Sequence, residues 1–300
     1  MAALYQTKDH REYFNPKISV LMPNYNKGSY IREAIQSVLD QTFEDFELIV
    51  VDDASNDSSI EVIESFIKRD RRVRLVHHPK NLGVAAAFNT GMTTAMSNLI
   101  CFIGSDDLYI RTKLAKQYEL MMSGNQTAIV YCEASKVDET GLAINRPRNS
   151  PRGYEGMIFS KLLQENFMVH ATMMVPKNFI DEAGKFDEAL SSYVDVDMSL
   201  RLAKKHPFKQ LNESLYLYRI YSGNTEGRIS RHNRYYNQGI VVERYLIDQY
   251  SLLKPAERRK VLARLFSSFV ATKQYGKLLE YGLTSTDGIL ALGDLVSRVV

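Results

Sequence analysis

The sequence of 300 residues contains no tryptophan, only two cysteines, and no apolar run near the roughly 18 residues of a membrane-spanning helix. Residues 1–17 are polar and mixed in charge, without the apolar segment of a signal peptide. The net charge of +3 is too small for a nucleic-acid-binding surface. Cys101 and Cys132 lie in apolar stretches, which favours buried free thiols over a single disulfide. We therefore expect a cytoplasmic protein that does not bind nucleic acid.

Two nucleotide-binding motifs are also absent. No G-x-x-x-x-G-K-[ST] segment is present, which argues against a P-loop kinase or ATPase. No G-x-G-x-x-G follows the first expected strand, which argues against a dinucleotide site of the Rossmann type. The sequence also shows no internal repeat and no low-complexity tract. A nucleotide would therefore have to be bound by other means.

The first hundred residues alternate between short apolar runs and segments of helical periodicity. Ser29 and Asp57 stand where they could cap two of the helices. This alternation predicts parallel βαβ units and an α/β sheet covered by helices on both faces. The predicted strands cover 18–22, 46–51, 73–77 and 99–103, and the predicted helices cover 29–40, 57–69 and 83–96.

The rest of the chain is less regular and then becomes helical. Pro255 is well placed to start a helix. We expect a catalytic core over 1–225 and a helical C-terminal extension over 226–300. Further strands are expected at 128–132, 171–175 and 215–220, a loop at 139–156, and helices near 111–123 and at 177–185, 232–251, 255–272 and 274–283.

Carboxylates follow the expected strands. Asp52 and Asp53 come after the second strand, Asp106 and Asp107 after the fourth, and Tyr25 after the first. In an open parallel sheet, ligands bind beyond the carboxyl ends of the strands, so we expect all five to converge on one crevice. Four clustered carboxylates repel one another unless a cation is present, and Mg²⁺ or Mn²⁺ shared with substrate phosphates would suit them. These residues predict a metal-dependent ligand that contains phosphate, but not the reaction.

Several ordered segments resemble one enzyme family. The run ISVLMPNYNKGSYIREAIQSVLDQTFEDFELIVVDDASND is similar to the opening of family 2 glycosyltransferases, and NLGVAAAFNTGM resembles their next segment. Ser105-Asp106-Asp107 matches their metal-binding DXD motif. GKFDEALSSYVDVDMSLRLAKK, at 184–205, resembles the segment that ends in their catalytic carboxylate. The similarity covers about 18–222 and implies the GT-A fold, a Rossmann-like and mostly parallel sheet, with inversion at the anomeric carbon.

The resemblance implies a role for several residues. Pro23 and Tyr25 would line the base and ribose pocket, and Asp53 would accept a hydrogen bond from the N3–H of uracil or thymine. Asp106 would lie near the ribose and the metal, and Asp107 would bind the Mn²⁺ or Mg²⁺ directly. The ion would stabilise the departing diphosphate. Asp195 would be the general base that takes the proton of an acceptor hydroxyl.

Two positions depart from the family pattern. The base motif often reads Glu-Asp in the family, and here it reads Val194-Asp195. A metal-binding histidine often follows a Tyr-Arg pair late in the core, but Tyr221 stands at that position here. Arg219 is then expected to contact phosphate. We also expect His170 and Tyr221 near the acceptor or phosphate, with a purely structural role for His170 as an equal alternative.

Other readings stay open beside these. The paired aspartates could form turns or caps, and Asp197 is expected to pair with Arg201 four residues later. His77 and His78 are expected at the surface. Seven basic residues of the C-terminal helices could lie on an anionic membrane at its inner face, but packing on the core or a homodimer contact is favoured. They are Arg231, Arg234, Arg244, Arg258, Arg259, Lys260 and Arg264, and Arg146, Arg148 and Arg152 are expected in a solvated loop.

The sequence therefore predicts a metal-dependent inverting hexosyl- or N-acetylhexosaminyltransferase. Its donor would be a UDP-sugar, or with less support a dTDP-sugar, and its acceptor a hydroxyl of a cell-surface glycan or lipid-linked glycan. Three alternatives remain. A sugar nucleotidyltransferase would need a glycine-rich loop bearing Arg or Lys after the first strand, which we do not find. A non-catalytic nucleotide-sugar-binding protein would not need Asp195. A scaffold protein would need none of these carboxylates and would show no metal-dependent nucleotide binding.

Overall fold

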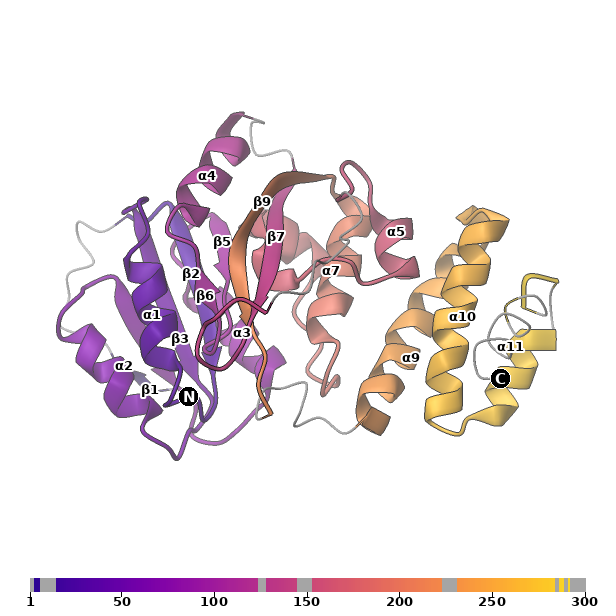
Figure 1. Cartoon of the computed structure of the whole chain (residues 1–300), viewed down its shortest axis with the longest axis horizontal. Helices are drawn as coiled ribbons and strands as arrows, with labels where there is room; N and C mark the ends of the chain where they lie inside the picture. The colour runs from indigo at the N-terminus through magenta and orange to yellow at the C-terminus, as the bar shows by residue number, and fades with distance from the viewer. Residues whose placement is uncertain are drawn as a thin grey trace.

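A computed structural model describes residues 3–5, 15–123, 128–144, 153–222, 231–283, 286–288 and 291. Over these residues the chain forms one mixed sheet of nine strands with helices on both faces (Figure 1). The strand order is β1-β4-β3-β2-β5-β8-β7-β9-β6. The strands are β1 (Ala3–Tyr5), β2 (Ile18–Asn24), β3 (Phe46–Asp52), β4 (Val73–His77), β5 (Leu99–Phe102), β6 (Leu108–Tyr109), β7 (Ile129–Val137), β8 (Met174–Pro176) and β9 (Phe208–Arg219).

Parallel pairing joins β4, β3, β2 and β5, which are the four strands predicted from the alternating first hundred residues. Beyond β5 the pairing is mixed, because β8 runs antiparallel to both β5 and β7, whereas β7 and β9 run parallel. Each parallel strand buries both of its faces. Ile18, Val20 and Met22 pack on one side of β2, and Leu21 packs on the other. Such continuous apolar strands need helices on both faces.

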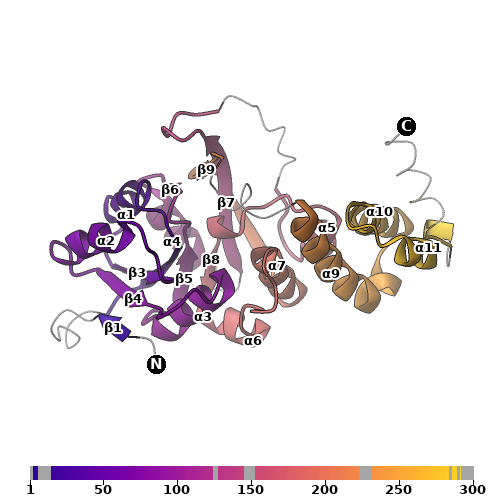
Figure 2. The same ribbon diagram turned by 90° about the horizontal axis from the view of Figure 1, so that it is seen from below.

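The helices supply that cover. Figure 2 shows α1 and α2 on one side of the sheet and α3 and α6 on the other. Their bounds are α1 (Ile31–Leu39), α2 (Ser59–Ile67), α3 (Val84–Thr94), α4 (Lys113–Ser123), α5 (Phe159–Gln164), α6 (Lys177–Ala183), α7 (Val194–Lys205), α9 (Arg231–Gln249), α10 (Pro255–Ala271) and α11 (Tyr275–Leu283). Short 3₁₀ helices cover His170–Thr172 and Tyr250–Leu252.

Most predicted elements are confirmed within a few residues, and Pro255 does begin α10. Ser29 is not the cap of α1, since the residue before that helix is Tyr30 and no side chain caps it. Asp57 lies one residue before the cap of α2, and its Oδ1 accepts the Ser59 N–H at 3.0 Å. The three arginines of the predicted loop and the predicted boundary at 225/226 lie outside the described residues.

The C-terminal helices pack on the core (Figures 1 and 2). Val241, Leu246, Leu262 and Phe266 belong to the same buried cluster as residues of α5 and α7. Arg264 of α10 donates to the carbonyls of residues 162 and 163 at 3.2 and 2.9 Å, so this member of the predicted basic surface points inward. Among the described residues, no helix has the length and apolar character needed to cross a membrane.

Candidate functional site

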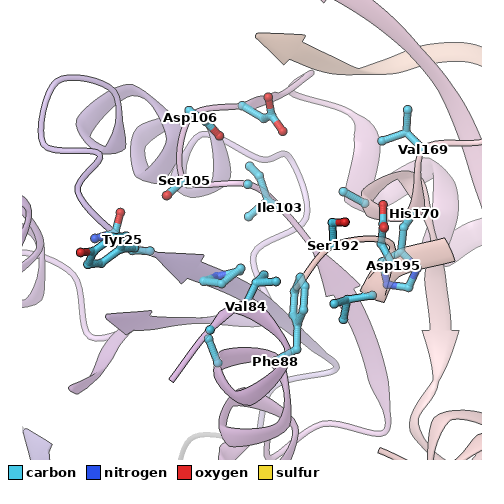
Figure 3. Close-up of a pocket in the computed structure, with 18 of the residues that line it drawn as sticks. Tyr25, Val84, Phe88, Ile103, Ser105, Asp106, Val169, His170, Ser192 and Asp195 are labelled. Atoms are coloured by element: carbon cyan, nitrogen blue, oxygen red, sulfur yellow. The ribbon is translucent and has the colours of Figure 1, made fainter. Parts of the chain in front are cut away.

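A cavity of about 780 Å³ opens beyond the carboxyl ends of β2, β3 and β5. This is where an open α/β sheet is expected to bind a ligand, and the volume falls in the usual range for small-molecule sites. Figure 3 shows Tyr25, Asp106, His170 and Asp195 around it. Of the nine site residues predicted from the sequence, eight line this cavity: Pro23, Tyr25, Asp53, Asp106, Asp107, His170, Asp195 and Arg219. The ninth, Tyr221, contacts two of the lining residues, Lys27 and Asp106.

Asp53 is held at one end of the cavity by its own surroundings. Its Oδ1 accepts the Leu82 N–H at 2.8 Å, its Oδ2 accepts the Gly83 N–H at 2.8 Å, and His78 Nδ1 lies 2.7 Å from Oδ1. Gly83 has φ of +91°, a conformation that glycine adopts without steric cost. The carboxylate is therefore fixed in place with acceptor lone pairs to spare. His78 is 1% exposed, so its predicted surface position was wrong.

Pro23 and Tyr25 lie on the same side of the cavity as Asp53. Pro23 is the next-to-last residue of β2 and is paired in register with Val51 of β3, and Tyr25 follows directly after the strand. The Tyr25 side chain is 39% exposed, so its ring is open at the edge of the site. An exposed aromatic ring beside a fixed carboxylate can stack on a planar base while the carboxylate accepts a hydrogen bond from it.

Asp52 does not reach the cavity. It is fully buried, and its two oxygens accept hydrogen bonds from Asn24 Nδ2 and from the amide and hydroxyl of Ser55, with His77 Nδ1 3.2 Å away. The expectation that four carboxylates converge on one crevice was therefore wrong. Asp52 is a structural residue that ties β2, β3 and β4 together.

Asp107 is buried under the opposite wall. Its Oδ2 accepts the Tyr216 hydroxyl at 2.6 Å and its Oδ1 accepts the Arg219 N–H at 2.8 Å. Burial, with the nearby charge of Asp106, raises the pKa of the Asp107 carboxyl to about 7, although the two hydrogen bonds and Lys27 oppose that rise. A neighbouring cation would favour the charged carboxylate.

Asp106 faces a lysine. Lys27 Nζ lies 2.6 Å from Asp106 Oδ2, and the Tyr221 hydroxyl donates to the same oxygen at 2.8 Å. Tyr221 also contacts Lys27 Nζ, and its ring packs 4.5 Å from that of Tyr30. Neither aspartate caps α4, so the capping alternative is not supported.

Gly104 leaves space between the two carboxylates. A Cβ added at this glycine would lie 2.7 Å from Asp107 Oδ2 and 3.1 Å from Asp106 Oδ1. Both carboxylates thus occupy the space that a side chain at residue 104 would fill. Two adjacent carboxylates suit a hard divalent ion that completes its shell with substrate phosphates. In the part of the chain that the structure describes, no three His, Cys, Asp or Glu side chains gather as a metal site, so the pair fits such an ion only with oxygens from the ligand.

The guanidinium of Arg219 is already bound by other groups of the protein, which the sequence did not indicate. It is 2% exposed, and its guanidinium binds the Asp106 carbonyl at 2.8 Å, the Glu139 carbonyl, and Glu33 at 2.6 Å. These contacts hold the end of β9 against the loop that carries Asp106. A contact between Arg219 and phosphate stays a prediction.

Asp195 lies in the first turn of α7 and is exposed to the cavity. The residue before the helix, Tyr193, has φ of +62°, which is uncommon for a residue other than glycine and is found at functional sites. Its hydroxyl donates to Gln238 of α9 at 2.5 Å. The turn that presents Asp195 is thus tied to the C-terminal helices.

Asp197 is structural, as expected. It is fully buried and pairs with Arg201 at 2.8 Å. It also accepts hydrogen bonds from Arg244 and Tyr245 of α9, each at 2.9 Å. The sequence could not reveal these last two partners, because they lie almost fifty residues away. Arg244 reaches this buried carboxylate from the surface, since its own side chain is 41% exposed.

His170 lines the same cavity as Asp195 (Figure 3) and is surrounded by the rings of Phe88, Phe102 and Phe186. Its ring centroid is 4.6 Å from that of Phe102, and burial lowers its pKa to about 3. The Ser199 hydroxyl donates to the Asp195 carbonyl at 2.7 Å and so must accept from His170 Nδ1–H at 2.9 Å. The other ring nitrogen, Nε2, is then an unprotonated acceptor, and it is buried with no hydrogen-bond partner among the described residues.

Comparison with known proteins decides the family. The model of glycosyl transferase family 2 matches residues 19–184, which is more than half of the chain. The chain belongs to glycosyl transferase family 2. Two curated relatives are an uncharacterized glycosyltransferase of Haemophilus influenzae, 36% identical over 165 residues, and a putative teichuronic acid biosynthesis glycosyltransferase of Bacillus subtilis, 30% identical over 164 residues. Each match covers 55% of this chain and 64% of the relative's own length.

Comparison with solved structures gives the same fold. S. aureus TarS 1–349, crystallised in complex with UDP-GlcNAc, superimposes with a TM-score of 0.65 at 20% identity, over 95% of this chain and 82% of TarS 1–349. That likeness confirms the predicted GT-A fold. The family match covers β2 to α6, whereas α7 with Asp195 lies beyond residue 184.

Proposed function

We propose that this family 2 member is a glycosyltransferase that moves a hexosyl or N-acetylhexosaminyl group from a UDP-sugar to a hydroxyl of a cell-surface or lipid-linked glycan. The observation that carries the proposal is that Asp53, the Asp106–Asp107 pair and Asp195 line one cavity. The complex of TarS with UDP-GlcNAc supports a UDP-sugar as donor. A dTDP-sugar is the second choice, because thymine offers the same N3–H to Asp53.

In this proposal one end of the cavity binds the nucleotide and the other end activates the acceptor. Tyr25 stacks on the uracil and Asp53 accepts its N3–H, so cytosine, which carries no N3–H, is rejected. Lys27 lies beside the carboxylate pair, at the place where the diphosphate would bind. When bound by Asp107, with Asp106 beside it, Mn²⁺ or Mg²⁺ would supply a Lewis acid for the departing diphosphate.

Asp195 would act at the other end of the cavity. It takes the proton of the acceptor hydroxyl as that oxygen attacks the anomeric carbon from the face opposite the diphosphate, which inverts the configuration. Its exposed carboxylate is suited to this, since it can approach an incoming hydroxyl without leaving the turn that Tyr193 and Gln238 hold.

The test is turnover of UDP-sugars by the full chain, with UDP release measured by chromatography and the anomeric configuration of the product by NMR. We expect transfer from UDP-GlcNAc or another UDP-hexose to a glycan acceptor, and its loss in Asp195→Asn with UDP binding retained. A non-catalytic binding protein would bind the donor without turnover in either protein. A sugar nucleotidyltransferase would instead release pyrophosphate from UTP and a sugar phosphate.

A further inference from the structure

Lys27 lies beside the two carboxylates proposed to bind the metal. Its Nζ is 2.6 Å from Asp106 Oδ2, and the Tyr221 hydroxyl contacts both groups. The side chains of Lys27 and Asp106 are only 9% and 16% exposed. Attraction between charges so far removed from water is screened much less than at the surface. The ammonium is thus the resident counter-ion of Asp106 in the ligand-free chain.

The backbone of Lys27 is fixed by hydrogen bonds, whereas its side chain is able to change partner. Its N–H donates to Ser59 Oγ at 3.1 Å, and its carbonyl accepts the N–H groups of Tyr30 and Ile31 at 2.9 Å. A lysine side chain is long and flexible, and its ammonium can rotate among acceptors. The ammonium can therefore change partner without any movement of the main chain.

A divalent ion at the carboxylate pair would be adjacent to this ammonium, and two cations on one carboxylate repel each other. The diphosphate of a nucleotide brings new negative charge to the same place. We propose that Lys27 exchanges partners, from Asp106 in the ligand-free chain to a diphosphate oxygen in the complex, and so makes the divalent ion bind well only together with the nucleotide. This inference rests on the proposed function.

Tyr221 is suited to assist the exchange. Its hydroxyl donates to Asp106 and contacts Lys27 Nζ, while its ring is packed on Tyr30. When the ammonium leaves, the tyrosine still supplies a hydrogen bond to Asp106. The carboxylate thus keeps its position for the incoming ion.

The test measures Mn²⁺ binding by the full chain through the electron paramagnetic resonance signal of free Mn²⁺, with and without UDP. The variant is Lys27→Met, which keeps most of the length of the side chain and removes its charge. The matched control is Lys116→Met, because Lys116 pairs with Glu213 at the surface, where both side chains are well exposed. Thermal unfolding of each protein shows that it is folded.

We expect wild-type protein to bind Mn²⁺ weakly alone and more tightly with UDP. Lys27→Met should gain about tenfold or more in affinity for Mn²⁺ alone and lose about tenfold or more in affinity for UDP with Mn²⁺ saturating, while Lys116→Met changes neither. Wild-type affinities in Lys27→Met, with UDP still bound by the wild type, would overturn the exchange and leave the proposed function standing. A wild type that binds no UDP at any Mn²⁺ concentration would overturn both.

Discussion

Asp197 on α7 accepts a hydrogen bond from Arg244 on α9, with 2.9 Å between Oδ1 and Nη1. The carboxylate is fully buried, two residues after Asp195, and it is also bound by Arg201 and Tyr245. The C-terminal helices are therefore connected to the helix of the proposed base through a buried charged group. They help to hold α7, the helix that carries Asp195, in place.

Removal of the Arg244 partner should destabilise the whole chain. Arg244→Met leaves Asp197 buried with one charged partner fewer, so we expect the free energy of unfolding to fall by about 1–3 kcal/mol. Urea unfolding measures it. Lys177→Met is the control, because that lysine pairs with Asp181 at the surface and should cost less than about 1 kcal/mol. Equal losses in the two variants would show that the contact between α7 and α9 carries no special weight.

Asp195 should be required for chemistry but not for donor binding. Asp195→Asn removes the proton acceptor and keeps the shape of the side chain, so we expect the transfer rate to fall by about 10²–10⁴-fold. The affinity for UDP should stay unchanged. Asp181→Asn, an exposed acid on α6, should leave both quantities as they are. A transfer rate for Asp195→Asn close to that of wild type would remove this residue from the mechanism.

Gly104 should not tolerate a side chain. In Gly104→Ala the new Cβ would collide with the Asp107 carboxylate and press on Asp106, so we expect metal-dependent affinity for UDP to fall by about tenfold or more. Gly276→Ala is the matched control, because this glycine lies in α11 with nothing within 4 Å of an added Cβ. The control should be neutral or slightly stabilising. Unaltered UDP affinity in Gly104→Ala would contradict the account of the carboxylate pair.

Sequence reasoning found the part of the fold that local pattern determines. The strands β2 to β5 are mostly apolar because both faces of the sheet are covered, and their alternation with helices along the chain indicates parallel pairing. The first half of β9 was missed, because Lys209 to Ser214 are polar or half-exposed and become a strand only through pairing with the distant β7. The direction of β7 and β8 depends on the same kind of tertiary contact.

In the site, too, the residues that depend on contacts distant in the sequence were missed. Asp53, Asp106 and Asp107 were found from their position after strands, and Asp195 from the family resemblance. Lys27 was missed because a lysine in an Asn-Lys-Gly turn reads as solvated, and its partner Asp106 is 79 residues away. Tyr193 was missed because neither its φ of +62° nor its contact with Gln238 leaves a signal in the sequence.

His170 should make the protein less stable in mild acid. Its pKa is lowered to about 3 in the folded chain and is about 6.5 when unfolded. The unfolded chain therefore binds one more proton between these values, and stability falls as pH drops below 6.5. From pH 7 to 5 this amounts to about 2 kcal/mol.

Replacement of His170 tests this contribution to the pH dependence of stability. In His170→Gln it is absent, so the free energy of unfolding should fall less between pH 7 and 5 than it does in wild type. Urea unfolding at several pH values in one buffer series gives both curves. Every other titratable group is common to the two proteins and cancels in the difference. Parallel curves would show that His170 is not buried in its neutral form.

The central claim is that this cavity is a metal-dependent site for a uridine nucleotide. Its most direct test is calorimetric titration of UDP and of CDP into the full chain, each with and without Mn²⁺, for wild type and Asp107→Asn. We predict UDP binding that needs Mn²⁺, is lost in the variant, and is much stronger than CDP binding, because only uracil donates N3–H to Asp53. No UDP binding with any metal, or equal binding of UDP and CDP, would contradict the account.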